Sequence, residues 1–220
     1  KEPGDNKAMV NARREFLSKG YYKPLVDRLT SLLNTYAPQD ANILDAGCGE
    51  GYYTHQHKQV KNTVYGIDIA KEAVKKAAKK YPECHFSVGT LSKLPFKDKE
   101  FDWLYSIYAP ILEQEFTRVL KKEGYLLTVT PAANHLIELK SCIYDKASLH
   151  DQDKSPIKAL TLTHEEQLTY EMTIGSGQDL LNLLSMTPFA FKATDTVRQQ
   201  LAESRNFRCQ ADFLIRLYKN

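Results

Sequence analysis

The sequence predicts an α/β fold with a mainly parallel, seven-stranded sheet, helices on both faces and a C-terminal antiparallel strand pair. Short apolar runs alternate with helical segments five times before residue 131, and parallel strands need such crossover connections. A glycine-rich turn follows the first apolar run, as at a ligand-binding edge of such a sheet. Alternation of apolar and polar residues over most of 207–217 is typical of a long, half-buried strand.

The N-terminal region is predicted to form two short helices. Apolar residues recur at helical spacing over residues 9–35, and Gly20 and Pro24 interrupt the pattern. We expect residues 1–36 to be a helical segment that adjoins the ligand site, and residues 37–220 to form the α/β domain.

The remaining elements are expected in a regular order. After a strand at 43–46 and a helix that begins near Tyr52, the sequence predicts strand 63–67, helix 71–80, strand 84–88, strand 101–107, helix 113–120 and strand 125–130. The strand at 207–217 is expected to pair with residues 167–174. Residues 145–160 are polar and are predicted to be an exposed excursion rather than a linker between domains.

The composition indicates one dominant core. Of the 220 residues 42% are hydrophobic and 26% are charged, which excludes a disordered tail and a short disulfide-stapled scaffold. The net charge is only +3, so binding of nucleic acid needs a local basic patch. No apolar run approaches the roughly 20 residues of a membrane span, and we expect a soluble cytoplasmic protein. The four cysteines are scattered, which argues against a disulfide framework or a metal site.

The glycine-rich turn is the clearest candidate for a ligand site. Gly47, Gly49 and Gly51 let the backbone turn tightly and let a ligand approach closely. Asp45 ends the first strand and Asp68 ends the second, and an acid at that edge can accept hydrogen bonds from ribose hydroxyls. A plain glycine turn with two helix-capping aspartates is the simpler alternative.

The spacing of the glycines distinguishes two classes of cofactor. Dinucleotide sites use the pattern G-x-G-x-x-G, because a diphosphate lies on the helix N-terminus. In this sequence the third glycine comes one place early and Tyr52 stands in its position, which favours a ligand without a diphosphate. The pattern Asp45-x-Gly47-x-Gly49-x-Gly51 resembles motif I of the Rossmann-like class I methyltransferases, which use S-adenosylmethionine. A nicotinamide enzyme is the less favoured alternative.

A closer resemblance runs from one end of the chain to the other. The sequence resembles the bacterial 23S rRNA guanine-N1 methyltransferases of the RlmA type. The segments that carry this resemblance are Pro3-Gly4-Asp5, residues 12–17, residues 20–25, residues 44–54, Leu94-Pro95-Phe96, Ile107-Tyr108-Ala109-Pro110, Thr130-Pro131 with His135-Leu136, residues 138–140 and residues 186–190. Gly-Glu-Gly-Tyr-Tyr-Thr and Ile-Tyr-Ala-Pro are much more specific than the glycine turn.

The resemblance implies which residues bind the cofactor and the target base. Tyr22, Gly49, Glu50 and His135 are implied to contact S-adenosylmethionine, beside the residues of the glycine motif and Asp68. In the loop after the third strand, Thr90 and Leu91 are plausible neighbours of the adenine. Tyr108, after the fourth strand, is a candidate for stacking on the target base. Without the resemblance, Tyr22 reads as a packed core aromatic and His135 as an ordinary helix-start residue.

The family also implies features that this sequence does not contain. Its members carry an N-terminal zinc-binding module with four cysteines, which nothing here can supply. We therefore expect this chain to be a truncated or partly ordered enzyme, without a metal site of its own. The resemblance makes a homodimer reasonable.

Contacts with ribosomal RNA are expected from basic residues before the glycine turn. Arg13, Arg14, Lys19 and Lys23 are interleaved with aromatic residues, an arrangement suited to phosphate contact and base stacking. The row of lysines over residues 71–80 reads as a solvated helix face. Two alternatives stay open: a methyltransferase for a small metabolite, and a non-catalytic RNA-binding module.

Overall fold

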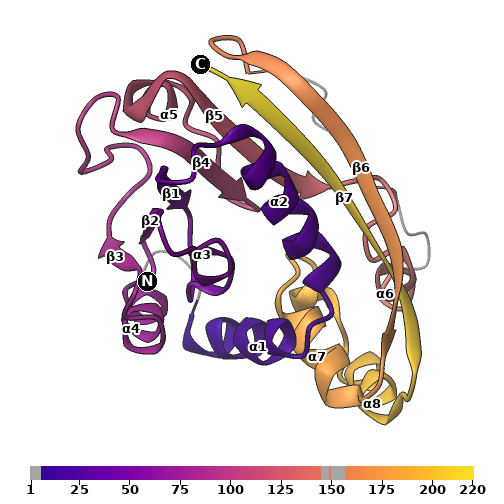
Figure 1. Cartoon of the computed structure of the whole chain (residues 1–220). Helices are drawn as coiled ribbons and strands as arrows, with labels where there is room; N and C mark the ends of the chain where they lie inside the picture. Colours follow the sequence, from indigo (N-terminus) through magenta and orange to yellow (C-terminus); the bar gives the residue numbers. More distant parts are fainter. Residues whose placement is uncertain (1–5, 145–148, 150–156) are drawn as a thin grey trace.

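The computed structural model describes residues 6–144, 149 and 157–220 (Figure 1). One seven-stranded sheet has the order β3-β2-β1-β4-β5-β7-β6, as the sequence predicts for a mainly parallel sheet with an added antiparallel pair. The strands are β1 Asn42–Ala46, β2 Thr63–Asp68, β3 His85–Val88, β4 Phe101–Ile107, β5 Leu120–Pro131, β6 Thr161–Ile174 and β7 Phe207–Lys219. All neighbours from β3 to β5 are parallel, whereas β7 runs antiparallel to β5 and to β6.

Helices and one short 3-10 segment connect the strands. They are α1 Lys7–Ser18, α2 Lys23–Tyr36, α3 Tyr52–Gln56, α4 Lys71–Lys80, α5 Glu113–Val119, α6 Ile137–Ser141, α7 Gly177–Ser185, η1 Ala190–Lys192 and α8 Asp195–Glu203. The break between α1 and α2 falls at Gly20, whose φ of +81° favours glycine. In Figure 1, α1 and α7 lie side by side, and α1 also contacts α4.

Both faces of the sheet are buried. Trp103 and Tyr105 of β4 point to one face, where they pack in the same cluster as Phe16 and Leu29 of the N-terminal helices. The intervening Leu104 points to the other face, together with Phe116 of α5. This alternation follows from the two-residue period of a strand, and it produces the helix-covered parallel sheet that the sequence predicts.

Two features of the structure differ from what the sequence predicts, and one prediction is mostly untested. The fifth strand begins at Leu120 and not at residue 125, because Leu120 already pairs with Phe101 and an irregularity before Trp103 absorbs the extra residues. The helices α7 and α8 were not predicted at all. The expected excursion at 145–160 falls mainly outside the described residues. Among the residues that are described, no helix is long and apolar enough to cross a lipid bilayer.

Candidate cofactor and substrate site

The glycine turn is fixed by backbone hydrogen bonds to the neighbouring strand. The N–H groups of Gly47 and Cys48 both donate to the Ile67 carbonyl, over 2.8 and 3.0 Å. Gly47 has a φ of +87°, and a Cβ there would lie 2.5 Å from the Cβ of Ala109 in the loop after β4. Only glycine therefore allows the turn after β1 and the loop after β4 to approach this closely.

Asp68 holds the turn from the end of β2. One carboxylate oxygen accepts from the N–H of Gly49 at 2.9 Å, and the other accepts from the N–H of Ala70 at 2.8 Å. Asp68 thus stabilises the glycine turn and the start of α4 together. Each carboxylate oxygen can accept a further hydrogen bond, so this geometry still permits contact with a ribose.

Asp45 does not line the cavity that the turn borders. Its side chain is only 2% exposed and accepts a hydrogen bond from the Thr54 hydroxyl at 2.7 Å. Burial raises the pKa of Asp45 to about 7; the bond from Thr54 opposes this shift, and the charges of Asp68 and Glu50 add to it. This placement corrects the sequence interpretation, because Asp45 supports α3 behind the turn instead of facing a ligand.

Gly51 is also absent from the cavity lining. It is the N-cap of α3 in the left-handed conformation, with a φ of +85°. A Cβ at this position would lie 2.9 Å from Ala77 of α4 and 2.9 Å from the ring of Phe86. Gly51 is therefore required for packing between α3 and its neighbours, and the structure places it behind the cavity wall.

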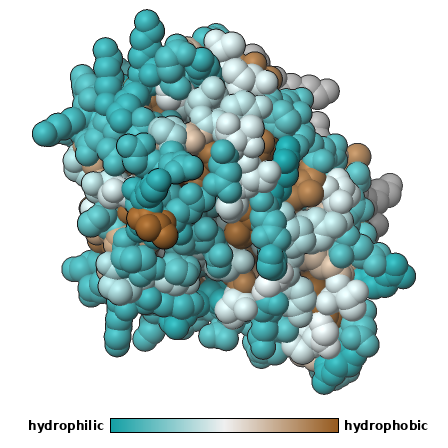
Figure 2. All heavy atoms as spheres, in the orientation of Figure 1, coloured by the Kyte–Doolittle hydropathy of each residue, from teal (hydrophilic) through white to brown (hydrophobic). Residues whose placement is uncertain are grey.

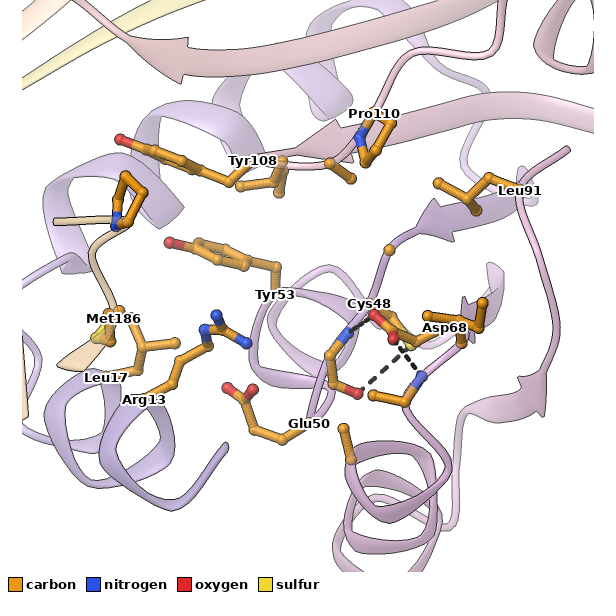
Figure 3. A pocket seen from close by; sticks show the side chains of 18 of the residues that line it. Arg13, Leu17, Cys48, Glu50, Tyr53, Asp68, Leu91, Tyr108, Pro110 and Met186 are labelled. Carbon is orange, nitrogen blue, oxygen red and sulfur yellow. Dashed lines mark hydrogen bonds between the residues drawn. The ribbon is translucent and has the colours of Figure 1, made fainter. Parts of the chain in front are cut away.

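A cavity of about 620 Å³ lies at the carboxyl ends of β1, β2 and β4. Its volume is in the usual range for small-molecule sites, and its position agrees with the rule for open parallel sheets. The structure brings eight of the expected cofactor residues together in its wall: Tyr22, Gly47, Gly49, Glu50, Asp68, Thr90, Leu91 and His135. Figure 3 shows Asp68 and Leu91 on one side of this cavity and Tyr108 and Met186 on the other.

The basic residues expected at RNA divide into two groups. Arg13 lines the cavity, and Figure 3 shows its guanidinium directed toward the Glu50 carboxylate. Arg14 and Lys19 are exposed outside the cavity on α1 and at its C-terminal end. Lys23 is also exposed, and it pairs with Asp27 at 2.6 Å.

The side of the cavity opposite Asp68 is aromatic and contains a connected hydrogen-bond chain. The Tyr108 hydroxyl lies 3.2 Å from Nε2 of His135, and Nδ1 of the same ring accepts from the backbone N–H of Asp212 at 3.1 Å. Tyr108 has a φ of +55°, which is uncommon for a side chain of this size and marks a position under strain. Its side chain is half exposed at the end of β4.

Several wall residues were not assigned from the sequence. They are mostly apolar and include Leu17, Tyr53, Leu183, Met186 and Phe189. Leu17, Tyr53, Met186 and Phe189 fall within the segments that carry the family resemblance, which was the available signal for them. Leu183 lies outside those segments and belongs to α7, which contacts α1, a pairing that no local pattern reveals.

The comparisons with known proteins agree with this geometry. A family model described as a methyltransferase domain matches residues 38–184. A Bacillus subtilis protein, YxjB, provisionally named a 23S rRNA (guanine-N(1)-)-methyltransferase, is 31% identical over 84% of this chain and 70% of its own length. A Micromonospora griseorubida protein with the same provisional name is 33% identical over 89% of this chain and 72% of its own. The chain belongs to the methyltransferase family of this model and these two relatives.

Other methyltransferases are similar over less of the sequence or in fold only. A malonyl-[acyl-carrier protein] O-methyltransferase of Hamiltonella defensa is 34% identical over 44% of this chain and 40% of its own length. The crystal structure of Bacillus subtilis YcgJ superposes with a TM-score of 0.56 at 17% identity, covering 86% of this chain and 96% of that one. This likeness shows the shared fold.

As a member of this methyltransferase family, the protein uses S-adenosylmethionine as its methyl donor. The wall residues fit such a ligand. Gly47 and Gly49 line the cavity without a side chain that would narrow it, and Asp68 offers carboxylate acceptors next to them. The cavity then continues to the aromatic side at Tyr108, which leaves a second region for a methyl acceptor.

Proposed function

We propose that this methyltransferase modifies N1 of a guanosine in 23S ribosomal RNA. The observation that carries the proposal is the two-sided cavity, in which the glycine turn and Asp68 lie opposite Tyr108, His135 and Met186. Aromatic side chains on this side of the cavity can enclose a planar base, and Tyr108 stands at the strand end where its hydroxyl would meet the edge of such a base. The two relatives named for guanine-N1 methylation support the choice of base.

Most residues assigned to the cofactor surround the part of the cavity beside the glycine turn, whereas Tyr22 and His135 lie on the opposite, aromatic side. Asp68 would hold the ribose, Thr90 and Leu91 would border the adenine, and Gly47 with Gly49 would pack against the amino-acid part. When bound, S-adenosylmethionine supplies an electrophilic methyl group attached to sulfur. The chain's part is to align the acceptor with that methyl group and to exclude water, because orientation provides much of the acceleration in such reactions.

Arg13 and Glu50 suggest a refinement of this assignment. Both line the cavity between its two sides, and they point toward one another in Figure 3. A guanidinium and a carboxylate there can receive the carboxylate and the ammonium group of a methionine moiety. We therefore transfer Arg13 from the expected RNA contacts to the cofactor site.

The surface charge favours RNA over a small metabolite. Without Arg13, the helix α1 with Lys19 and the helix α4 together carry eight lysines and arginines against two glutamates, on a chain whose net charge is only +3. The two helices contact each other, and each contributes residues to the cavity wall. A basic surface beside the site is what phosphate binding requires. The lysines of α4, expected to be merely solvated, are therefore included in the proposed RNA surface.

Methylation of naked large-subunit RNA tests the proposal. Purified protein is incubated with labelled S-adenosylmethionine and 23S rRNA, and the product is digested to nucleosides and identified by mass spectrometry. The expected product is 1-methylguanosine, and incorporation should disappear after treatment with ribonuclease. Incorporation that resists ribonuclease would instead support a small-metabolite methyltransferase, for which the partial likeness to malonyl-[acyl-carrier protein] methyltransferases is the argument.

A charge variant tests the RNA surface separately. Replacing the exposed Lys71, Lys79 and Lys80 by glutamine should raise the KM for RNA several-fold and flatten its dependence on salt. The matched control replaces Lys97, Lys99 and Lys122, which are exposed near the amino ends of β4 and β5, away from the cavity. An equal effect of both variants would show that only the net charge matters.

A further inference from the structure

His135 is held in one tautomer by its surroundings. A backbone N–H is always a donor, so the bond from Asp212 N–H requires an unprotonated Nδ1 on His135. A neutral imidazole then carries its proton on Nε2, which lies 3.2 Å from the hydroxyl oxygen of Tyr108. His135 therefore donates to Tyr108. Protonation of Nδ1 as well would break the hydrogen bond from the Asp212 N–H. This is unfavourable because Asp212 is fully buried.

This donation determines where the Tyr108 hydroxyl proton points. The oxygen already accepts from His135, so its own hydrogen is turned away from the imidazole and is free to donate elsewhere. In the described part of the chain no acceptor for it is seen. Tyr108 lines the cavity, is half exposed and is held at a φ of +55° by its place between β4 and the loop that meets Gly47. The Tyr108 hydroxyl is therefore available as a hydrogen-bond donor in the wall on the acceptor side of the cavity.

We propose that the Tyr108 hydroxyl, oriented by His135, donates to the 6-oxo oxygen of the target guanine. This inference rests on the proposed function and specifies how the site recognises its base. Guanine presents an acceptor at position 6, whereas adenine presents an amino donor, which would face another donor. His135 is thus a positioning residue, and Tyr108 is the residue that touches the base.

The donor also assists the chemistry at N1. Guanine N1 carries a proton at neutral pH, and its loss moves negative charge onto the 6-oxo oxygen. A preorganised donor aimed at an oxygen where charge develops favours that ionisation. The proton passes to solvent water, and the freed N1 electron pair forms the new bond to the methyl carbon while the carbon–sulfur electrons stay on sulfur. Charge and atoms balance without any further co-reactant.

The effect of the Tyr108 hydroxyl on the ionisation of guanine N1 can be measured from how the reaction rate depends on pH. The titratable side chains that face its hydroxyl are Tyr22, Tyr53, Tyr170 and Asp212, besides His135. Burial raises the pKa of each of these three tyrosines above its ordinary value. Burial also pushes the pKa of Asp212 upward, but hydrogen bonds from Gln167 and Thr169 outweigh it and hold that pKa below its usual range. None of these four groups changes charge between about pH 7 and 9. Burial raises the pKa of Asp45 to about 7, but the wild type and the Tyr108 variant both carry Asp45, so the ratio of their rates reports on the base.

The first test is spectroscopic and needs no activity. Protein labelled with 15N at histidine is examined by NMR between about pH 6 and 9, and the His135 signals are assigned by their loss in a His135→Gln variant. The expected spectrum shows an unprotonated Nδ1 and a protonated Nε2 throughout this range. A protonated Nδ1 would overturn the proposal, because Tyr108 would then have to donate to His135 and could not donate to the base.

The second test is kinetic and uses a double-mutant cycle. Tyr108→Phe should lower kcat on rRNA by about a hundredfold at pH 7 with little change in KM, and the deficit should shrink toward pH 9 as N1 ionises unaided. His135→Leu should cause a similar loss, and adding it to Tyr108→Phe should cost little more, because it acts through that hydroxyl. Losses that multiply, or a deficit that does not depend on pH, would contradict the inference.

Two controls separate this inference from its neighbours. Tyr36→Phe removes a hydroxyl from the end of α2, outside the cavity wall, and should leave kcat unchanged. His135→Gln keeps one donor and one acceptor, so a partial recovery relative to His135→Leu is expected. If the wild-type protein makes no 1-methylguanosine, the proposed function fails; if it does so and Tyr108→Phe is equally active, only the role of Tyr108 fails.

Discussion

Replacing Asp45 by asparagine should change how the stability of the protein depends on pH. Burial raises the pKa of this carboxyl from 3.8 to about 7, so between these values the folded protein keeps a proton that the unfolded chain has lost. The wild type therefore loses stability as the pH rises through this window. The loss is about 1.4 kcal/mol for each pH unit, and about 4 kcal/mol over the whole window.

Asparagine cannot ionise and still offers an oxygen to the Thr54 hydroxyl. The stability of Asp45→Asn relative to the wild type should therefore rise by about 1.4 kcal/mol per pH unit from about pH 4 to 7 and then level off. Urea unfolding at several pH values gives both free energies of unfolding. Asp40→Asn is the control, because it removes a carboxyl group from an exposed position. Parallel curves for Asp45→Asn and the wild type would show that burial does not suppress ionisation of Asp45.

Three further substitutions have defined outcomes. His57 is fully buried, and burial lowers its pKa from 6.5 to about 3. The wild type therefore loses stability as the pH falls through that window. In urea unfolding, His57→Phe should be more stable than the wild type by about 2 kcal/mol at pH 5, and equally stable near pH 8. Asp68→Ala should weaken binding of S-adenosylmethionine by roughly 1–3 kcal/mol in calorimetry, and unchanged affinity would refute its contact with the ribose. In thermal unfolding, Gly47→Ala should lower stability by about 2–4 kcal/mol, because its Cβ would lie 2.5 Å from that of Ala109. Gly175→Ala is the control and should be neutral, because a Cβ at Gly175 would meet nothing within 4 Å.

Much of the sheet was predictable because short apolar runs in the sequence mark its strands. The predicted strand 101–107 matches β4. The helix predicted at 71–80 matches α4, because alanines recur at helical spacing along it and Pro82 follows its end. The early start of β5 was missed because polar residues at 121–124 resemble a turn, and only pairing with β4 makes them part of a strand. The helix α7 carried a readable signal: Ser176 caps it and accepts from the N–H of Asp179.

The site was predictable where it depends on the glycine motif and the resemblance. The structure gathers Gly49, Asp68 and His135 in one cavity wall, although they come from distant parts of the chain. The direction of a side chain is harder to predict than its position in sequence. Asp45 turns toward Thr54, and Arg13 turns into the cavity, and both outcomes depend on how helices pack against the sheet.

The contact between Gly47 and Ala109 has a consequence for both regions of the cavity. These residues belong to the two loops that carry the donor region and the acceptor region, and almost no space separates them. A methyl donor that orders the turn after β1 therefore also orders the loop after β4, from which Tyr108 reaches the methyl acceptor. The two regions thus share one wall, so a bulkier side chain at either position would disturb both of them.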